Sequence, residues 1–440
     1  MRHPDRRNVL YGVAGSGIFF TISAASPSAR KATRSFAEFG AQGDGQNDDT
    51  AAINRAAQWS AAHRGKVVGR QGVEYRIVPS IQNSFLSPGG GTFSALVGIT
   101  IPSAAEIDFN GASLKIDGEG IGLSNESSVR GRDCIIVKNV RVDIRSGGEY
   151  GLLFVGCVNS TFSNISVVNG RSVAVAFASL SDCFIDQISV EDCVGLGVVV
   201  GGNTAWRVSD CHVGRLTGRN IASAGTVHQP GNPFLFGAVN TKIDLLDARN
   251  CAGGIKFTSG CDRIKCDSVY FDNAAVNGQA LATDNSGLKV QGDSAAACAD
   301  NLTFNRVVVT NCSGAGLFLR YCSNVVIHSY RGINNGRQHV QPDINCVDGG
   351  SLYIDSAEIV NPGARSIQMS KASKKLEIVV MKLLDSGDHV SVFPEAMIAD
   401  GGLTSIGSVT TNKLRAPVFR IGSNAGFQAK LHVGRFVSRP

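Results

Sequence analysis

Residues 246–273 read LDARNCAGGIKFTSGCDRIKCDSVYFDN, and this stretch holds one complete copy of the unit that decides the fold. Leu246 opens a short segment that reaches Asn250 four residues later, and Val269 opens the next, which reaches Asn273. The two openings are 23 residues apart. Between them, the apolar run IKF is flanked by Gly, Ser and Asp, a pattern typical of strands separated by turns.

Eight segments of the chain share this pattern. They open at Ile165, Ile188, Leu216, Leu246, Val269, Val307, Tyr330 and Ala357, and four residues later they carry Asn169, Asp192, Asn220, Asn250, Asn273, Asn311, Asn334 and Asn361. Three intervals are 23 residues long, and the others, of 28, 30, 38 and 27, are 23 plus an insertion. A fixed short period of strand-like units indicates a solenoid. We therefore predict an all-β, single-stranded parallel β-helix, whose eight coils at about 4.8 Å spacing stack to roughly 34 Å.

Asparagine suits the recurring position for two physical reasons. Its side chain tolerates left-handed backbone angles, so it permits one tight bend in every coil. Stacked carboxamides also hydrogen-bond to one another along the axis of a stack of strands. Glycine supports the same picture, because 52 of 440 residues are Gly, about 12% against a usual 7%.

The first 29 residues are predicted to be an export signal. Arg6 and Arg7 precede a moderately apolar stretch, and DRRNVL (5–10) resembles a twin-arginine signal, with Asp5 in place of the usual hydroxyl residue. The resemblance implies a periplasmic or extracellular protein with no stable membrane insertion after processing. Its removal lowers the formal charge from +6 to +4, too little to favour a nucleic-acid partner.

The twelve cysteines are predicted to be buried thiols. Cys193, Cys251 and Cys312 share one position of the repeat, but a coil without cysteine separates each from the next. Two coils span about 9.6 Å, beyond the reach of a disulfide. A small apolar side chain suits a narrow core. The sequence contains no CxxC pair and no HExxH, so it predicts no zinc site.

An N-terminal motif, FGAQGDGQNDDT (39–50), precedes the one clear helical pattern, AAINRAAQWSAA (51–62). Gly43 and Gly45 permit a tight turn. Asp48 or Asp49 can cap a helix that begins near Thr50, and that helix would cover the open first coil. We interpret these carboxylates as structural.

This motif resembles the N-terminal motif of the pectate-lyase-like superfamily, which includes polygalacturonases, other polysaccharide-active enzymes and phage tailspikes. The resemblance implies a right-handed parallel β-helix with an N-terminal capping helix. We expect a cap over residues 30–100, in which SFLSPGGGTFS (84–94) is a loop, coils over 101–380, and further strands or a cap over 381–440. Of the motifs shared by galacturonan hydrolases, only Arg-Ile-Lys (263–265) is present, so a standard polygalacturonase is not predicted.

Alternation along the strand after each Asn turn predicts one functional face. Aligning 255–258 with 288–291 and 317–320 gives two outward columns: Lys256, Lys289 and Phe318, then Thr258, Gln291 and Arg320. Insertions at about 221–236, 274–286 and 335–343 enter just ahead of these strands. Loops beside a rigid sheet form groove walls. These insertions would bring His228, Asp284, Arg337, His339 and Asp343 to the same face.

A cationic, partly aromatic groove suits an anionic polysaccharide, because Lys and Arg bind carboxylates and Phe318 can stack on a sugar. For a lyase, we expect Lys256 or Lys289 as base and Arg320 as the group that neutralises the uronate, helped by a calcium ion on Asp284 or Asp343.

Two alternatives stay open. A hydrolase would need two carboxylates, and Asp284 and Asp343 are the available pair. A non-catalytic rod that binds polysaccharide, like a tailspike or an adhesin, would use the same surface. We expect Thr258, Gln291, His228, His339, Arg337 and Phe318 to contact the ligand in each case. No feature of the sequence predicts an oligomeric state.

Overall fold

The computed structural model describes residues 31–439, apart from 88–89, 127–132, 145–148, 203, 225–230, 273–285, 337–340, 364, 370–374, 385–396, 400–402, 413–418 and 422–429. The predicted export signal lies outside the described residues, as do Asn273, His228, Asp284, Arg337 and His339. The description below concerns the unit Ala32–Pro440.

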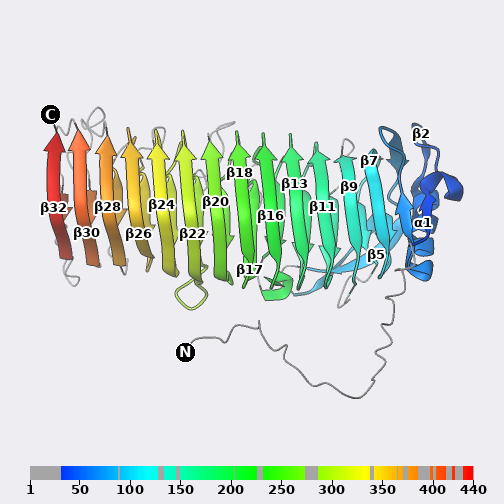
Figure 1. Cartoon of the computed structure of the whole chain (residues 1–440), viewed down its shortest axis with the longest axis horizontal. Helices are drawn as coiled ribbons and strands as arrows, with labels where there is room; N and C mark the ends of the chain where they lie inside the picture. Colours follow the sequence, from blue (N-terminus) through cyan, green and yellow to red (C-terminus); the bar gives the residue numbers. More distant parts are fainter. Residues whose placement is uncertain are drawn as a thin grey trace, which may run out of the picture. The chain divides into compact units, whose positions relative to one another are not determined.

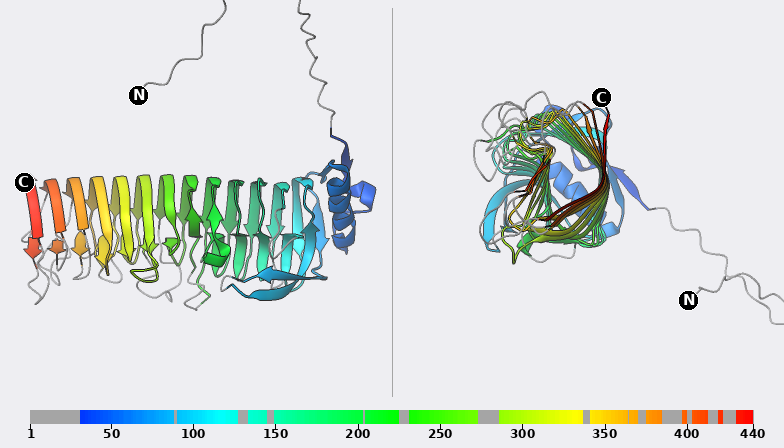
Figure 2. Two further views of the ribbon diagram at one scale, coloured as in Figure 1. Left: turned by 90° about the horizontal axis from the view of Figure 1, so that it is seen from below. Right: turned by 90° about the vertical axis from the view of Figure 1, so that its left-hand side faces the viewer.

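This unit is an elongated stack of coils that superimpose when viewed along the axis (Figures 1 and 2). Each coil adds one strand to a long-stranded sheet A and one to a short-stranded sheet B. Sheet A contains β7 (Glu106–Ile116), β9 (Ile136–Asp143), β11 (Thr161–Val168), β13 (Phe184–Glu191), β16 (His212–Arg219), β18 (Lys242–Arg249), β20 (Asp262–Asp272), β22 (Ala299–Thr310), β24 (Cys322–Ile333), β26 (Ser351–Val360), β28 (Lys375–Leu384), β30 (Leu403–Asn412) and β32 (Lys430–Arg439). Sheet B contains β6 (Thr92–Ile101), β8 (Ile121–Asn125), β10 (Tyr150–Val155), β12 (Val173–Ala178), β14 (Leu196–Gly201), β17 (Phe234–Val239), β19 (Ile255–Thr258), β21 (Leu288–Gln291), β23 (Leu317–Arg320), β25 (Ile344–Val347), β27 (Ile367–Met369), β29 (Met397–Ala399) and β31 (Phe419–Ile421).

The predicted parallel β-helix is confirmed, and so is its register. Leu246 pairs with Val269 in parallel strands, and Val307 pairs with Tyr330. Sheet A also extends beyond the eight coils marked by the Asn repeat, with β7 and β9 before the first and β28, β30 and β32 after the last. The same backbone ladder joins these outer coils, so the solenoid continues where the Asn rhythm of the sequence is lost.

The recurring turn residues form a ladder along the stack. The seven that the structure describes all have left-handed φ angles, between 49° and 61°. The Nδ2 of Asn334 donates to Oδ1 of Asn311 over 3.1 Å, and the Nδ2 of Asn361 donates to Oδ1 of Asn334 over 2.8 Å. Farther along, Asn250 donates to Asn220 over 3.4 Å, and Asn220 to Asp192 over 2.9 Å. One bend per coil is therefore fixed directly over its neighbour.

Inward apolar and aromatic side chains fill most of the interior. Phe236 stacks on Phe257 with ring centroids 4.8 Å apart, and Phe257 meets Phe304 edge to face at 5.2 Å. All twelve cysteines are free thiols and ten are buried, as predicted. Burial raises the pKa of the Cys251 and Cys261 thiols to about 12. These thiols are therefore packing groups and poor nucleophiles.

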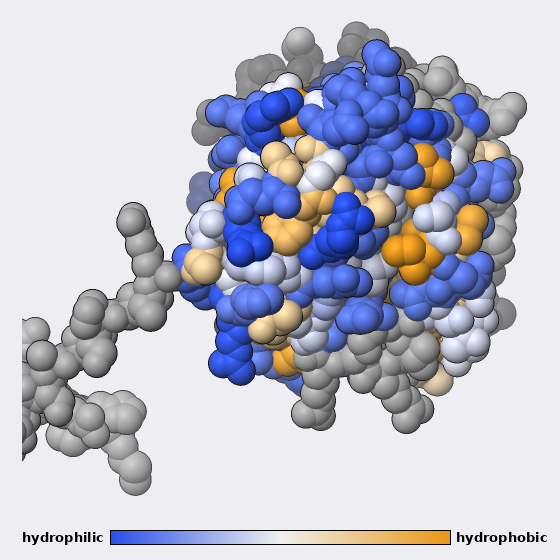
Figure 3. All heavy atoms as spheres, turned by 90° about the vertical axis from the view of Figure 1, so that its right-hand side faces the viewer, coloured by the Kyte–Doolittle hydropathy of each residue, from blue (hydrophilic) through white to orange (hydrophobic). Residues whose placement is uncertain are grey.

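A cap of short elements closes the N-terminal end of the stack. It comprises β1 (Thr33–Ser35), η1 (Phe36–Phe39), β2 (Asp44–Asp48), α1 (Thr50–His63), β3 (Lys66–Val68) and β4 (Glu74–Ile77). Helix α1 buries Ile53 and Ala57 in the core, and the end it covers is mostly hydrophilic outside (Figure 3). In the described part of the chain, no helix is long and apolar enough to cross a membrane.

The carboxylates of the N-terminal motif hold the backbone, in agreement with their structural interpretation. Asp49 accepts hydrogen bonds from the amides of Gln42 and Gly43, at 2.6 and 3.1 Å. Asp48 accepts one from the Thr50 amide at the start of α1, at 3.0 Å. Within the described residues, no group of three or more His, Cys, Asp or Glu is placed to hold a metal ion.

One element departs from the prediction. The stretch expected to be a loop, 84–94, belongs largely to an antiparallel hairpin of β5 (Ile81–Leu86) and β6. This hairpin, called the arm below, lies along the outer face of sheet B (Figure 2). Its side chains join a second apolar core with outward residues of sheet B and with Trp206 of η2 (Thr204–Trp206). The short Gly- and Ser-rich sequence hid this role, because the partner surface comes from coils far along the chain.

The ladder predicts an order of stability for two substitutions at Asn334. Asn334→Gly keeps access to φ 56° but loses the two ladder bonds, and we expect a cost of about 1–2 kcal/mol. Asn334→Ala should cost about 1 kcal/mol more, because alanine resists positive φ. Chemical denaturation of the two variants checks the order. Equal stability of both variants would contradict the left-handed bend.

Candidate functional site

The predicted alignment on the outer face of sheet B is confirmed by the strand register. Lys256 pairs with Lys289, which pairs with Phe318 on the next coil. The column continues through Asn345 to Gln368. Thr258, Gln291 and Arg320 form the neighbouring column in the same way. The sequence therefore predicted the correct neighbours across three coils, and the structure extends the column by two more.

The expected exposure of this column is wrong for two members. Lys289 is only 3% exposed and Phe318 only 4%, and the Lys289 ammonium lies 5.5 Å from the centroid of the Phe318 ring. A cation over an aromatic face is attracted by its quadrupole, more strongly when water is excluded. Phe318 is thus covered in this conformation, and it offers a ligand no open stacking surface. Lys256, Thr258, Gln291 and Arg320 remain half-buried at the surface.

Arg320 is the best-positioned cation at this surface. Its Nε lies 2.9 Å from Oδ2 of Asp348, and its guanidinium carbon lies 4.9 Å from the centroid of the Tyr321 ring. These two contacts fix the plane of the guanidinium. Asp348 offsets part of the charge of Arg320, but the guanidinium stays half-exposed and oriented, and its remaining N–H groups can bind a carboxylate.

Two amide oxygens beside these residues lack hydrogen-bond partners among the described residues. They are Oε1 of Gln291 and Oδ1 of Asn345, and both atoms are buried although their side chains are only half-buried. Gln291 pairs with Arg320 in the register, and Asn345 pairs with Phe318. Buried polar atoms are normally hydrogen-bonded, so each exception needs an explanation. Both oxygens can accept from hydroxyl groups.

Asp343 does not face the groove, contrary to the prediction. It is fully buried inside the coil, where it accepts hydrogen bonds from the Tyr330 hydroxyl and from Nδ2 of Asn335, the latter at 3.0 Å. The insertion that precedes β25 turns inward at its last residue, which sequence spacing alone does not show. With both oxygens occupied in the core, Asp343 fits neither a calcium ligand nor one of two catalytic carboxylates.

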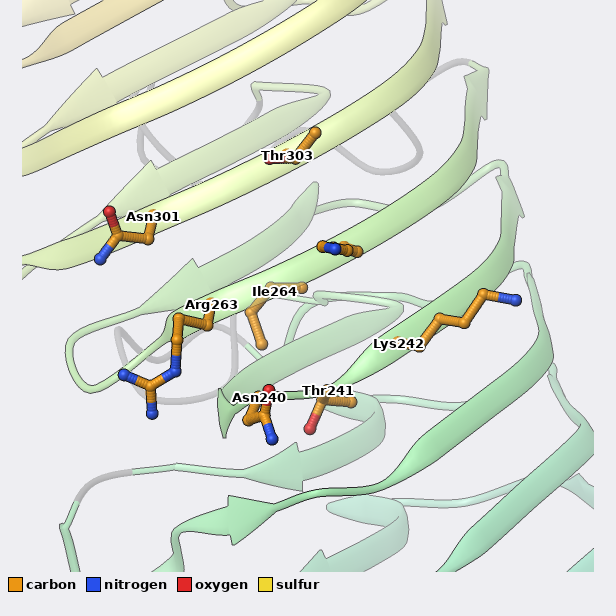
Figure 4. Close-up of a pocket in the computed structure, with 8 residues that line it drawn as sticks. Asn240, Thr241, Lys242, Arg263, Ile264, Asn301 and Thr303 are labelled. Atoms are coloured by element: carbon orange, nitrogen blue, oxygen red, sulfur yellow. The ribbon is translucent and has the colours of Figure 1, made fainter. Parts of the chain in front are cut away.

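A separate hollow of about 650 Å³ lies on the outer face of sheet A (Figure 4). Its lining is Asn240, Thr241, Lys242, Arg263, Ile264, Lys265, Asn301 and Thr303. Arg263 and Lys265 point outward on either side of buried Ile264, as expected. Arg263 is paired with Asp262 at 2.7 Å, and Lys242 with Asp244 at 2.7 Å. Because carboxylates neutralise two of its three cations, this hollow is a weaker anion site than its lining suggests.

Comparison with known proteins supports the fold. No family model matches the sequence, and no curated protein is similar to it. The structure resembles that of PfbA, a surface adhesin of Streptococcus pneumoniae, with a TM-score of 0.53 and 11% identity over 90% of this chain and 93% of that one. This likeness shows a shared β-helix fold.

Two further solved structures have lower scores. They are the A-module of the Azotobacter vinelandii mannuronan C-5 epimerase AlgE6, at 0.46 and 12% identity over 92% of this chain and 99% of that one, and the tailspike of E. coli bacteriophage HK620 in complex with pentasaccharide, at 0.42 and 9% identity over 92% and 78%.

The buried Asp343 predicts a pH dependence of stability. Burial raises the pKa of its carboxyl to about 6, above the value of about 4 in an unfolded chain. The folded protein therefore binds more protons between these values, and this group makes stability fall as the pH rises from about 4 to 6.

In the Asp343→Asn variant, this loss should be absent. Relative to the unsubstituted protein, the variant should gain up to about 3 kcal/mol between pH 4 and pH 7. Denaturation midpoints measured across that range check the result, with the exposed Asp293→Asn as control. A constant difference between Asp343→Asn and the unsubstituted protein would rule out the pKa shift.

Proposed function

We propose that the protein is an exported β-helix that binds an acidic polysaccharide along the outer face of sheet B, from β19 to β27, and cleaves it by β-elimination. One observation carries the proposal. A half-exposed, oriented cation, Arg320, stands on a coil between Gln291 and Asn345, whose amide oxygens have no hydrogen-bond partner among the described residues. Their combination matches the two groups that every uronate presents, a carboxylate and hydroxyl donors.

The binding contacts follow from the chemistry of each side chain. Arg320 pairs with a sugar carboxylate, and a charge-assisted bond of this kind is stronger than a neutral one. The side chains of Gln291 and Asn345 are only half-buried, so a turn of each amide group brings its oxygen, buried in the free protein, to a sugar hydroxyl as an acceptor. Successive coils lie about 4.8 Å apart. A polymer lying along the axis therefore meets the same kinds of group repeatedly.

For the elimination step, Lys256 is the proposed base. Its amine takes the proton from the carbon next to the uronate carboxylate, and the electron pair forms a carbon–carbon double bond as the bond to the leaving oxygen breaks. The leaving oxygen takes a proton from water as the new chain end departs, and Lys256 keeps the proton that it removed. Arg320 neutralises the carboxylate so that negative charge can develop beside it. The positive charge of Lys289, packed on Phe318 below the surface, favours the same anionic state.

A non-catalytic binder is the second candidate, and the burial of Lys289 and Phe318 favours it, because it leaves fewer reactive groups at the surface. The similarity to an adhesin structure agrees with this alternative. A hydrolase has less support, because Asp343 lies in the core and Asp284 lies outside the described residues. The site of action, periplasmic or extracellular, rests on the signal in residues 1–29.

The binding surface can be tested with Arg320→Gln. Loss of the charge-assisted contact should weaken binding to the preferred polysaccharide by about tenfold or more. Lys265→Gln is a matched control, since Lys265 is an exposed cation on sheet A and makes no ion pair within the described part of the chain. It should change the affinity less than twofold. Equal effects of the two substitutions would remove the assignment to sheet B.

The reaction can be tested by incubating the mature protein with a panel of acidic polysaccharides and recording ultraviolet absorbance from unsaturated sugar ends. We expect absorbance that Lys256→Gln abolishes while binding persists. Binding without absorbance or new reducing ends would identify the non-catalytic alternative. New reducing ends without absorbance would indicate hydrolysis. Failure of every polysaccharide to bind would overturn the proposed function.

A further inference from the structure

We propose that the arm and Trp206 close one end of the binding face, so that the protein takes hold of a polysaccharide at its terminus and not along its interior. This inference rests on the proposed function and adds a determinant of specificity to it. The arm is the hairpin of β5 and β6, and Trp206 lies in η2, in the connection that follows β14.

A single outward column of sheet B shows where the face begins. In register order it contains Ser124, Leu153, Ala176, Val199, Leu235, Lys256, Lys289, Phe318, Asn345 and Gln368. From Leu153 to Leu235 every member is apolar. From Lys256 to Gln368, every member except Phe318 is charged or an amide. The column thus changes from apolar to mostly polar side chains between β17 and β19.

The arm buries the apolar members of this column. Phe85 of β5 and Val97 of β6 are fully buried in a second core, together with Leu153 and Val199 of the column. Outward apolar side chains would expose a large apolar surface if nothing covered them. The arm therefore occupies the outer face of sheet B over the early coils, and a ligand cannot extend there.

The tip of the arm lies where the column changes. Strand β5 ends at Leu86, and the Ser87 amide donates to the Gly91 carbonyl at 2.7 Å to close the turn. The indole Nε1–H of Trp206 donates to the Leu86 carbonyl at 2.7 Å. Trp206 is only 3% exposed. The bond ties the connection after β14 to the arm tip.

That connection also crosses the outer face of β17. A Cβ atom added to Gly237 would lie 1.8 Å from the Gly202 carbonyl oxygen, so the two backbones touch there. Gly237 follows Phe236, whose partner in the next coil is Phe257, so its own neighbour there is Thr258. The obstruction therefore stands one coil before Thr258 and Lys256. Only the side toward β27 continues as a polar surface within the described residues.

The arm tip and Trp206 together form an obstruction, called the wall, on the outer face of sheet B. A polymer that lies along the axis must end there. A chain end fits such a closed cleft, whereas an internal segment would have to pass through the arm. The two modes of binding differ in how many protein molecules one polysaccharide chain can hold. Binding at one terminus allows one protein per chain whatever its length, while internal binding allows more on longer chains.

The test uses isothermal titration calorimetry with short and much longer fractions of one acidic polymer, polygalacturonate or, if that does not bind, alginate. We expect the protein to bind with a stoichiometry of one per chain in both fractions. A stoichiometry that rises with chain length would overturn this inference alone. Absence of binding to both polymers in either fraction would overturn the proposed function and this inference with it.

Substitutions at the wall sharpen the test. Trp206→Ala removes the indole ring and the bond by which it holds the arm tip, so the tip can move off the outer face; more than one molecule should then bind each long chain, while the short fraction is unchanged. Trp206→Phe keeps an aromatic body in place and should retain one protein per chain. Circular dichroism confirms that each variant is folded. If Trp206→Ala does not fold, the stoichiometry of the unsubstituted protein still decides the question.

Discussion

The left-handed bend that recurs once per coil is the constraint on which the structure depends. Residues such as Asn311, Asn334 and Asn361 adopt positive φ, and their side chains bond directly to one another along the axis. This fixes the angular position of each coil relative to the next. Once that position is set, inward and outward side chains stay in columns, and the core and the surface repeat from coil to coil.

The sequence was sufficient for the fold because its signals are local and repeated. The Asn spacing predicted the parallel register, and alternation predicted the column from Lys256 to Phe318, both of which are confirmed. The burial of outward side chains by other segments of the chain was not predictable. Alternation shows which way Lys289 points, but its burial depends on what lies above it, and Asp343 turns inward through loop geometry that leaves no periodic signal.

The arm is a second feature whose burial could not be predicted from its own sequence. Its sequence is short and rich in Gly and Ser, but Phe85 packs in an apolar core with side chains from coils far along the chain. Outward residues such as Leu153 and Val199 carried the missing signal, since apolar side chains on both faces of a strand indicate that both faces are covered. The end of the stretch that the arm covers is also the boundary of the proposed binding face.

The uninterrupted coils have a further consequence for how such a chain can change over generations. The unit from Asn169 to Asp192 begins and ends at the same left-handed turn and contains no insertion. Duplication or loss of one such unit would lengthen or shorten the rod by one step without disturbing the facing of any other side chain. The ladder thus makes the molecule modular, and its reach can vary by recombination while its ends stay the same.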